Sequence, residues 1–169
     1  MQTLTPQTVI ADLQRRGLDR PMRFFETTTA TSQQAADNIG CELGQIVKSL
    51  CFIVETDSGR QPILVLASGD QRVDDRKIAG WYNVGRKRVK IATPEECIEI
   101  YGYAPGSVPP LAHRTQDLPT YIDASLERYD QLYAAGGAHN AIFPISLVEL
   151  IRVTGGKMMD VVRKDAENP

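Results

Sequence analysis

Two neighbouring apolar runs constrain the fold of this chain more than any other feature of its sequence. Residues 46–54 and 63–67 are dense in β-branched and large apolar side chains, as in strands that are buried on both faces. Asp57-Ser58-Gly59 lies between the two runs and is typical of a tight turn. The runs therefore predict a hairpin of core strands.

Further helix and strand signals surround this hairpin. Capping residues and stop glycines predict helices over residues 5–17, 31–38, 74–79, 93–101 and 146–153. Short apolar runs predict strands over residues 89–92, 121–124, 131–135, 141–145 and 158–162. Because strands outnumber helices and many connections are short, we expect an α/β (mixed α+β) fold. Its sheet should be mixed and largely antiparallel, with helices packed around it.

Length and charge limit the domain organisation and the partners. A chain of 169 residues fits one domain, which we expect to span residues 1–169. The net charge of −2 gives no overall attraction to nucleic acid, so any RNA contact must come from a local patch. The first residues show no signal-peptide pattern, and no apolar run approaches the roughly 20 residues that a membrane span needs. We therefore expect a cytoplasmic protein without a membrane partner.

The three cysteines and two histidines argue against a metal centre or a disulfide framework. Cys41, Cys51 and Cys97 are odd in number and widely spaced, and no Cys-x-x-Cys pair occurs. His113 and His139 alone cannot form a histidine-rich cluster. We expect reduced, mostly buried thiols, no metal and no other cofactor.

Lys48 is out of place in the first apolar run. Strand alternation puts it on the same face as Ile46, Leu50, Phe52 and Val54, where an unpaired ammonium group is costly. Lys48 either reaches water at the end of the strand or pairs with a carboxylate for structural reasons. A third interpretation is that the strand opens into a pocket where Lys48 holds an anion or a polarised carbonyl.

Two loops carry the other candidate residues. Residues 102–110 are rich in glycine and proline, so the main-chain amides of Gly106, Ser107 and Val108 could donate to a developing oxyanion. An ordinary rigid turn is the alternative. His139 follows Gly136-Gly137-Ala138 and is either a general base or a structural hydrogen-bonding residue.

Two further patterns concern catalysis and RNA. The chain has no Gly-x-Ser-x-Gly motif, so a Ser-His-Asp hydrolase is poorly supported. Arg86, Lys87 and Arg88 form the one basic run, which either contacts RNA phosphates or is simply solvated.

Taken together, several motifs resemble the YbaK/EbsC and prolyl-tRNA-synthetase-associated editing family, in order and spacing, over residues 27–162. The matching segments are Ile46-Val47-Lys48-Ser49-Leu50, Val65-Leu66-Ala67-Ser68-Gly69-Asp70 with Arg72-Val73, Gly106-Ser107-Val108-Pro109-Pro110-Leu111-Ala112-His113, Tyr121-Ile122-Asp123, Ala135-Gly136-Gly137-Ala138-His139 and Leu150 through Thr154-Gly155-Gly156. The resemblance implies a YbaK-like fold and a trans-editing deacylase that hydrolyses the ester of mischarged tRNA. The tRNA would be that for proline or a related one, and the amino acid alanine, serine, threonine or cysteine.

The resemblance also implies roles for residues. Lys48 would contact the 3′-terminal nucleotide, residues 106–110 would cradle the aminoacyl carbonyl, and a ribose hydroxyl would help to activate water. The residues expected to contact the substrate are Ser49, Ser68, Pro109, Pro110, His113, Gly137 and His139. The partner would be mischarged tRNA, with an aminoacyl-tRNA synthetase as a second candidate.

The sequence departs from the family pattern at two loop positions. Ser107 and Ala112 stand where the family has glycines, which puts the amino acid specificity in doubt more than the reaction. Two rival functions therefore stay open. One is a tRNA- or synthetase-binding module without turnover, and the other is a hydrolase of small aminoacyl esters.

Overall fold

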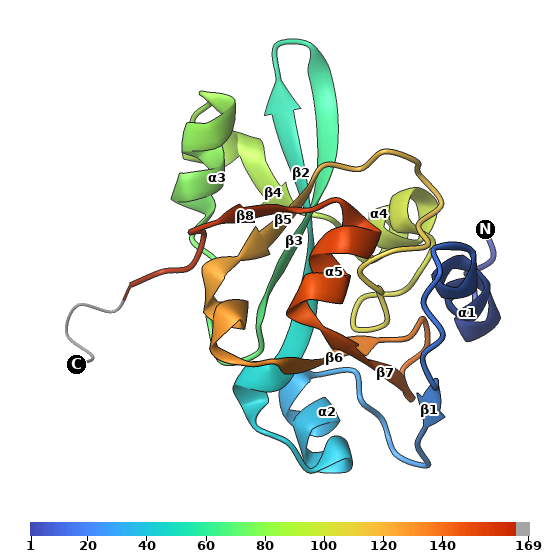
Figure 1. Cartoon of the computed structure of the whole chain (residues 1–169). Helices are drawn as coiled ribbons and strands as arrows, with labels where there is room; N and C mark the ends of the chain where they lie inside the picture. Colours follow the sequence, from blue (N-terminus) through green and yellow to red (C-terminus); the bar gives the residue numbers. More distant parts are fainter. Residues whose placement is uncertain (165–169) are drawn as a thin grey trace.

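The computed structural model describes residues 1–164, so the last five residues of the expected domain lie outside it. The predicted hairpin is confirmed: β2 (Ile46–Thr56) and β3 (Gly59–Ser68) pair antiparallel from Val47↔Ser68 to Thr56↔Gly59. Its turn stands out from the rest of the sheet in Figure 1. Both strands are longer than predicted because polar residues at their ends also join the ladder, which needs only main-chain groups.

The hairpin is the centre of an eight-stranded sheet with the order β1-β7-β6-β2-β3-β5-β8, and β4 also pairs with β2 (Figure 1). The other strands are β1 (Arg23–Phe24), β4 (Val89–Ile91), β5 (Thr120–Asp123), β6 (Gln131–Ala135), β7 (Ala141–Ser146) and β8 (Lys157–Met159). Among the described strands, β2–β6, β3–β5 and β5–β8 are parallel and the other four pairings are antiparallel. The mixed sheet is confirmed. The two-residue strand β1 was not predicted, because it is too short to show alternation.

Five helices pack around the sheet: α1 (Pro6–Arg15), α2 (Ser32–Ile39), α3 (Asp75–Tyr82), α4 (Pro94–Glu96) and α5 (Leu147–Thr154). The predicted caps are present, since the side chains of Thr31, Thr93 and Ser146 each accept a hydrogen bond from the amide three residues on. A π-helical turn, Cys97–Tyr101, continues α4 to the predicted end. Within residues 1–164, no helix has the length and apolar character required to cross a bilayer.

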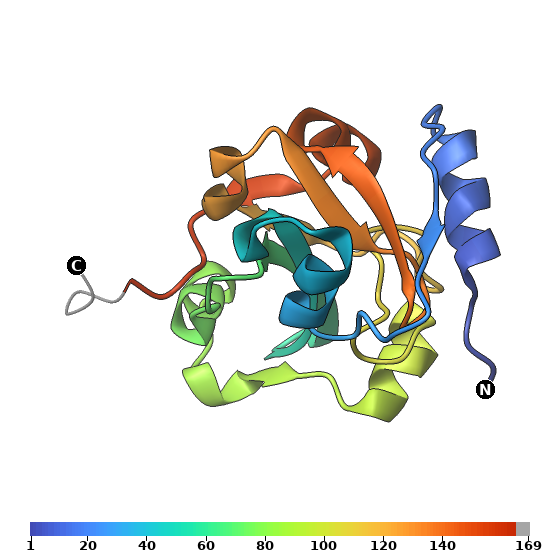
Figure 2. The same ribbon diagram turned by 90° about the horizontal axis from the view of Figure 1, so that it is seen from below.

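Alternation along β2 divides the core between the two faces of the sheet. Val47, Cys51 and Ile53 pack with residues of α1, α5 and the π-helical turn. Phe52 and Val54 pack on the other face with α3, and Ile46 packs there with α2. Both views place α1 and α3 on opposite sides of the molecule (Figures 1 and 2). On the face shared by α2 and α3, residue 48 therefore lies between the two helices.

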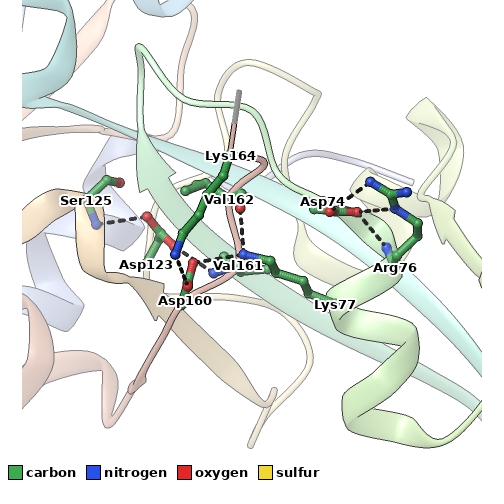
Figure 3. Close-up of polar contacts among 9 residues, drawn as sticks. All are labelled: Asp74, Arg76, Lys77, Asp123, Ser125, Asp160, Val161, Val162 and Lys164. Atoms are coloured by element: carbon green, nitrogen blue, oxygen red, sulfur yellow. Dashed lines mark hydrogen bonds and ion pairs between the residues drawn. The ribbon is translucent and has the colours of Figure 1, made fainter. Parts of the chain in front are cut away.

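The C-terminal segment is held by the side chains of the buried Asp123 and of Lys77 (Figure 3). The carboxylate of Asp123 accepts hydrogen bonds from the amides of Val161 and Ser125, both at 2.8 Å. Lys77 binds the carboxylate of Asp160 at 3.0 Å and the carbonyl of Val162 at 2.8 Å. β8 ends at Met159, earlier than predicted, because the chain then leaves β5: the amide of Val161 bonds to the side chain of Asp123, and Val162 forms an isolated antiparallel bridge with Val73.

Candidate active site

The outer edge of β2 is interrupted where Lys48 and Ser49 lie. At one end of the strand, Ile46 and Val47 pair with β6. At the other end, residues 52–54 pair with β4, and the amide of Ala92 donates to the carbonyl of Cys51 at 2.9 Å. Between these contacts, no described strand covers the edge. A sheet that parts in this way leaves main-chain groups available to a ligand.

A cavity of about 270 Å³ opens at this gap. Its walls come from β2, the segment that leads into α2, the glycine-proline loop, β6 and β7. The lining residues are Thr29, Ala30, Thr31, Ser32, Ala35, Ile46, Val47, Lys48, Ser49, Leu50, Gly106, Val108, Tyr133, Ala134, Ala135 and Ile142. The segment of residues 29–32 was not predicted to belong to the site. Its capping pattern revealed the helix but not the strand beside which that helix packs.

Lys48 is half-buried in the wall of this cavity, and its ammonium group donates a hydrogen bond to the main-chain carbonyl of Gln71. Burial lowers the pKa of Lys48, while the charge of Asp70 acts in the opposite direction. The carboxylate of Asp70 is itself held by Arg128, at 2.7 and 3.0 Å. Within the described part of the chain, Lys48 forms no ion pair, so its charge is available to an anion in the cavity.

The glycine-proline loop reaches the same cavity through a tight turn. The amide of Ser107 donates to the carbonyl of Ala104 at 3.0 Å, and Gly106 has a φ of 85°. Pro105 and Gly106 at the centre of this turn are the type II signature. A side chain on residue 106 would also meet the carbonyl oxygen of Ala30 at 2.8 Å, so only glycine fits.

This turn corrects one part of the predicted oxyanion site. Ser107 is buried, its amide is already bonded within the turn, and its carbonyl accepts from the amide of Gly137 at 3.1 Å. Ser107 therefore has no amide to offer a ligand. Gly106 and Val108 do line the cavity, so two of the three expected residues lie beside Lys48. The Pro-Gly pair in the sequence was the signal that could have shown this.

His139 and Gly137 lie behind the cavity wall and do not line it. The exposed ring of His139 bonds through Nε2 to the carbonyl of Pro105 at 3.0 Å. The main-chain carbonyl of His139 accepts from the amide of Thr29 at 2.6 Å. His139 thus holds together the two segments that carry Thr29 and Gly106.

Four other predicted substrate contacts also lie outside this cavity. The hydroxyl of Ser68 donates to the carbonyl of Gly44 at 2.8 Å and is fully buried. His113 bonds to the carbonyl of Pro109 at 2.7 Å, and burial lowers its pKa to about 4. With Pro110, His113 lines a second cavity of about 360 Å³ beside α1. Ser68 therefore holds the turn before β2 and His113 braces the loop, and neither lines the first cavity.

Ala112, the second loop position at which the sequence departs from the family pattern, has an unusual backbone conformation. Ala112 has a φ of 66°, a left-handed conformation in which glycine is favoured. Its carbonyl accepts from the hydroxyl of Tyr103 at 2.8 Å, which helps to hold the backbone in this form. Ala112 lines the second cavity, so this departure does not change the first.

The basic run lies far along the sheet from Lys48. Arg86, Lys87 and Arg88 form a single 3₁₀ turn before β4. Arg86 bonds to Asp75 at 2.8 Å, and Arg88 lies 3.6 Å from Asp57. Since β4 pairs with β2 as far as Val54, six residues beyond Lys48, the run is about 20 Å from that lysine.

Comparison with known proteins decides the family. Residues 26–153 match the family described as the aminoacyl-tRNA editing domain. The chain belongs to this family. The editing domain described here is 34% identical to a crystal structure described as a candidate trans-editing enzyme for prolyl tRNA synthetase, with a TM-score of 0.85 over 97% of this chain and 100% of that one. The predicted fold class and family are therefore confirmed.

Two curated relatives show the range of contexts of the editing domain. The uncharacterized protein YwhH of Bacillus subtilis (strain 168) is 36% identical over 145 residues, which are 85% of this chain and 87% of YwhH. Proline–tRNA ligase of Staphylococcus aureus (strain Newman) is 27% identical over 114 residues, 67% of this chain but only 19% of the ligase. The chain thus resembles one segment of a much larger synthetase.

Proposed function

We propose that this protein hydrolyses the ester bond between an amino acid and its tRNA, acting in trans on mischarged tRNA. The observation that carries the proposal is that Lys48 of β2 and Gly106 and Val108 of the loop line one cavity. A volume of about 270 Å³ suits a small ligand group, so the tRNA itself would lie outside. Membership of the editing-domain family supports the reaction.

The chemistry of the lining supports catalysis by orientation. Among the described residues that line the cavity there is no histidine, cysteine, aspartate or glutamate, so the walls offer no conventional general base. An aminoacyl ester is an activated bond, for which positioning and stabilisation of the oxyanion supply most of the rate. In this proposal Lys48 holds the anionic 3′ end, Gly106 and Val108 face the carbonyl, and a ribose hydroxyl of the substrate positions water.

The substrate of one relative suggests the identity of the tRNA. A protein of known structure that is 34% identical in sequence to this chain is described as a candidate trans-editing enzyme for prolyl tRNA synthetase. We therefore propose tRNA for proline, or a related tRNA, as the nucleic acid partner, and a synthetase as a second partner. The family resemblance adds alanine, serine, threonine or cysteine as the amino acid, and the side chains of all four are small enough for this cavity.

A panel of mischarged tRNAs tests the proposed function. The purified protein is incubated with alanyl-, seryl-, threonyl- and cysteinyl-tRNA for proline, and the loss of amino acid is compared with a buffer control. We expect at least one ester to be hydrolysed far faster than in buffer. If none is, and charged tRNA still binds tightly, the protein is a binding module and the hydrolase assignment is wrong.

The basic run separates a tRNA substrate from a small ester. Replacing Arg86, Lys87 and Arg88 with alanine should reduce kcat/KM for an aminoacyl-tRNA by about tenfold at low salt, with a weaker salt dependence. Hydrolysis of a 3′-aminoacyl-adenosine, which cannot reach 20 Å along the sheet, should be unchanged. An equal loss on both substrates would contradict a phosphate contact at this run.

A further inference from the structure

The main chain of Ser49 points into the gap at the edge of β2. In an antiparallel ladder, successive residues of a strand direct their N–H and C=O groups to opposite edges. The amide of Gly69 donates to the carbonyl of Ile46 at 2.8 Å, so the even-numbered residues of β2 face β3. The odd-numbered residues, including Ser49, therefore face the other edge.

Ser49 differs from its two neighbours on that edge. Val47 pairs with Ala134 of β6, and the carbonyl of Cys51 accepts from Ala92 at 2.9 Å. For Ser49, the strand pairings and main-chain bonds of the described residues provide no partner. Ser49 is partly buried and lines the cavity, but its hydroxyl oxygen is fully covered. The exposed surface of Ser49 therefore comes from its other atoms. An N–H and a C=O of the same residue thus face the ligand space side by side.

We propose that the aminoacyl group binds to this edge as a one-residue antiparallel strand, an inference that rests on the proposed function. The α-ammonium group of the substrate donates to the carbonyl of Ser49, and the ester carbonyl accepts from the amide of Ser49. An extended amino acid carries the same donor and acceptor as a strand residue, so the two sets match. The substrate class is therefore the ester of an amino acid with a free α-amino group.

This arrangement assigns two tasks to Ser49. Its amide stabilises the negative charge that develops on the carbonyl oxygen when water attacks, as oxyanion donors do. Its carbonyl recognises the ammonium group through a charge-assisted hydrogen bond, which is stronger than a neutral one. The amide of Ser49 replaces that of Ser107, which the turn at Gly106 has already engaged.

Modified substrates test the recognition of the amino group. The protein is given alanyl-tRNA, its deaminated lactyl-tRNA counterpart and N-acetyl-alanyl-tRNA, and each rate is divided by the rate of the same ester in buffer. We expect the enhancement to fall about tenfold or more for lactyl-tRNA and about 100-fold or more for the N-acetyl ester. Equal enhancements for all three esters would overturn the inference and leave the proposed function intact.

A binding measurement keeps the inference testable if no ester is hydrolysed. The probes are 3′-amino-3′-deoxyadenosine carrying an alanyl amide, and the same compound carrying a lactyl amide. Tighter binding of the alanyl amide, by about tenfold, would support the inference even though the hydrolase assignment had failed. Equal binding of the two would overturn it.

A proline variant tests the amide of Ser49. Because this N–H has no ladder partner, Ser49→Pro removes it without removing a bond of the sheet. We expect kcat/KM for aminoacyl-tRNA to fall about 100-fold with the circular dichroism spectrum retained. The matched control is Ile91→Pro, which places a proline on the outer edge of β4, away from the cavity, and should keep its rate within twofold.

A chemical variant covers the case in which Ser49→Pro fails to fold. Replacing the amide nitrogen of Ser49 with an ester oxygen, through ligation of two segments at Cys51, deletes the N–H group without the ring of proline. It also makes the carbonyl of Lys48, which faces β3, a weaker acceptor, so folding is checked by circular dichroism. The expected loss is again tenfold or more. A folded protein of either kind that retains the wild-type rate would overturn the role of the Ser49 amide.

Discussion

The cavity beside Lys48 and the cavity beside α1 differ in whether their polar groups are already satisfied. The second cavity, at about 360 Å³, is larger than the first, at about 270 Å³, and contains more charged residues. Its buried Asp12, however, binds Arg16 at 3.0 Å and also Arg15. In the first cavity, the ammonium group of Lys48 bonds to the carbonyl of Gln71 but has no carboxylate partner among the described residues, and the edge of β2 at Ser49 is unpaired. The difference teaches that unused binding capacity, rather than size or charge, singles out the first cavity as the candidate site.

The loop of residues 106–113 contributes its first residues to the first cavity and its last residues to the second. Its first residue, Gly106, lies against Ala30 in the wall of the first cavity. Its last residue, His113, lines the second cavity, is partly buried and bonds to the carbonyl of Pro109. Changes at the first cavity should therefore affect the reaction, and changes at the second should affect stability.

Lys48→Ala should have the largest effect. We expect kcat/KM for aminoacyl-tRNA to fall about 1,000-fold, because Lys48 is the one charged residue among the described residues that line the cavity. The free energy of unfolding should fall by no more than about 1 kcal/mol, since Lys48 forms one hydrogen bond, to the carbonyl of Gln71, and no ion pair within residues 1–164. A variant that folds and keeps more than a tenth of the activity would contradict the claim that the first cavity, rather than the second, carries out the reaction.

Acid should destabilise the protein through His113. Its pKa of about 4 in the folded state lies below the ordinary value of 6.5, so the unfolded chain takes up the proton first. The stability from the neutral ring is therefore complete above pH 6.5 and is lost as the pH falls toward 4. We expect the free energy of unfolding to drop by about 3 kcal/mol over this range. Denaturant titrations of the wild type and of His113→Asn check this, because the variant should lack the slope.

Asp12→Asn should weaken the fold without affecting the reaction. Its carboxylate is buried and holds two arginines at the end of α1. Removing the charge should lower the free energy of unfolding by about 2 kcal/mol, because the arginines lose their partner. Deacylation by the folded variant should stay within twofold of the wild type. A larger loss of activity would mean that the second cavity takes part in the reaction.

Ser49→Ala should have the smallest effect on stability. Its hydroxyl is the one buried side-chain polar atom without a hydrogen-bond partner in the described residues. Removing a group that is buried but unsatisfied should leave the free energy of unfolding unchanged or raise it by up to about 1 kcal/mol. Thermal unfolding is the measurement. A clear loss of stability would show that the hydroxyl has a partner.

Local signals in the sequence predicted most of the fold. The hairpin around Asp57-Ser58 and the caps at Thr31, Thr93 and Ser146 depend on residues within four positions of each other, so the sequence reveals them directly. Parallel pairings such as β2–β6 join segments that are far apart in the chain, and alternation does not specify them.

The candidate site was predictable only in part, for the same reason. Lys48 was identifiable because a charge interrupts an apolar strand, and Gly106 because it lies in a loop rich in glycine and proline. The contact between Gly106 and Ala30 depends on long-range packing. So does the gap at Ser49, which exists because β6 leaves β2 after Val47 and β4 joins it later. The sequence contains no local sign of either feature.

A crystal structure with a stable aminoacyl analogue tests the central claim most directly. The ligand is 3′-amino-3′-deoxyadenosine carrying an alanyl amide, which cannot be hydrolysed as an ester. We predict that its aminoacyl group occupies the first cavity, between Ser49 and Gly106, with the ammonium group of Lys48 toward the nucleotide. An analogue bound beside His113 in the second cavity, or on the open surface with the first cavity empty, would contradict the account.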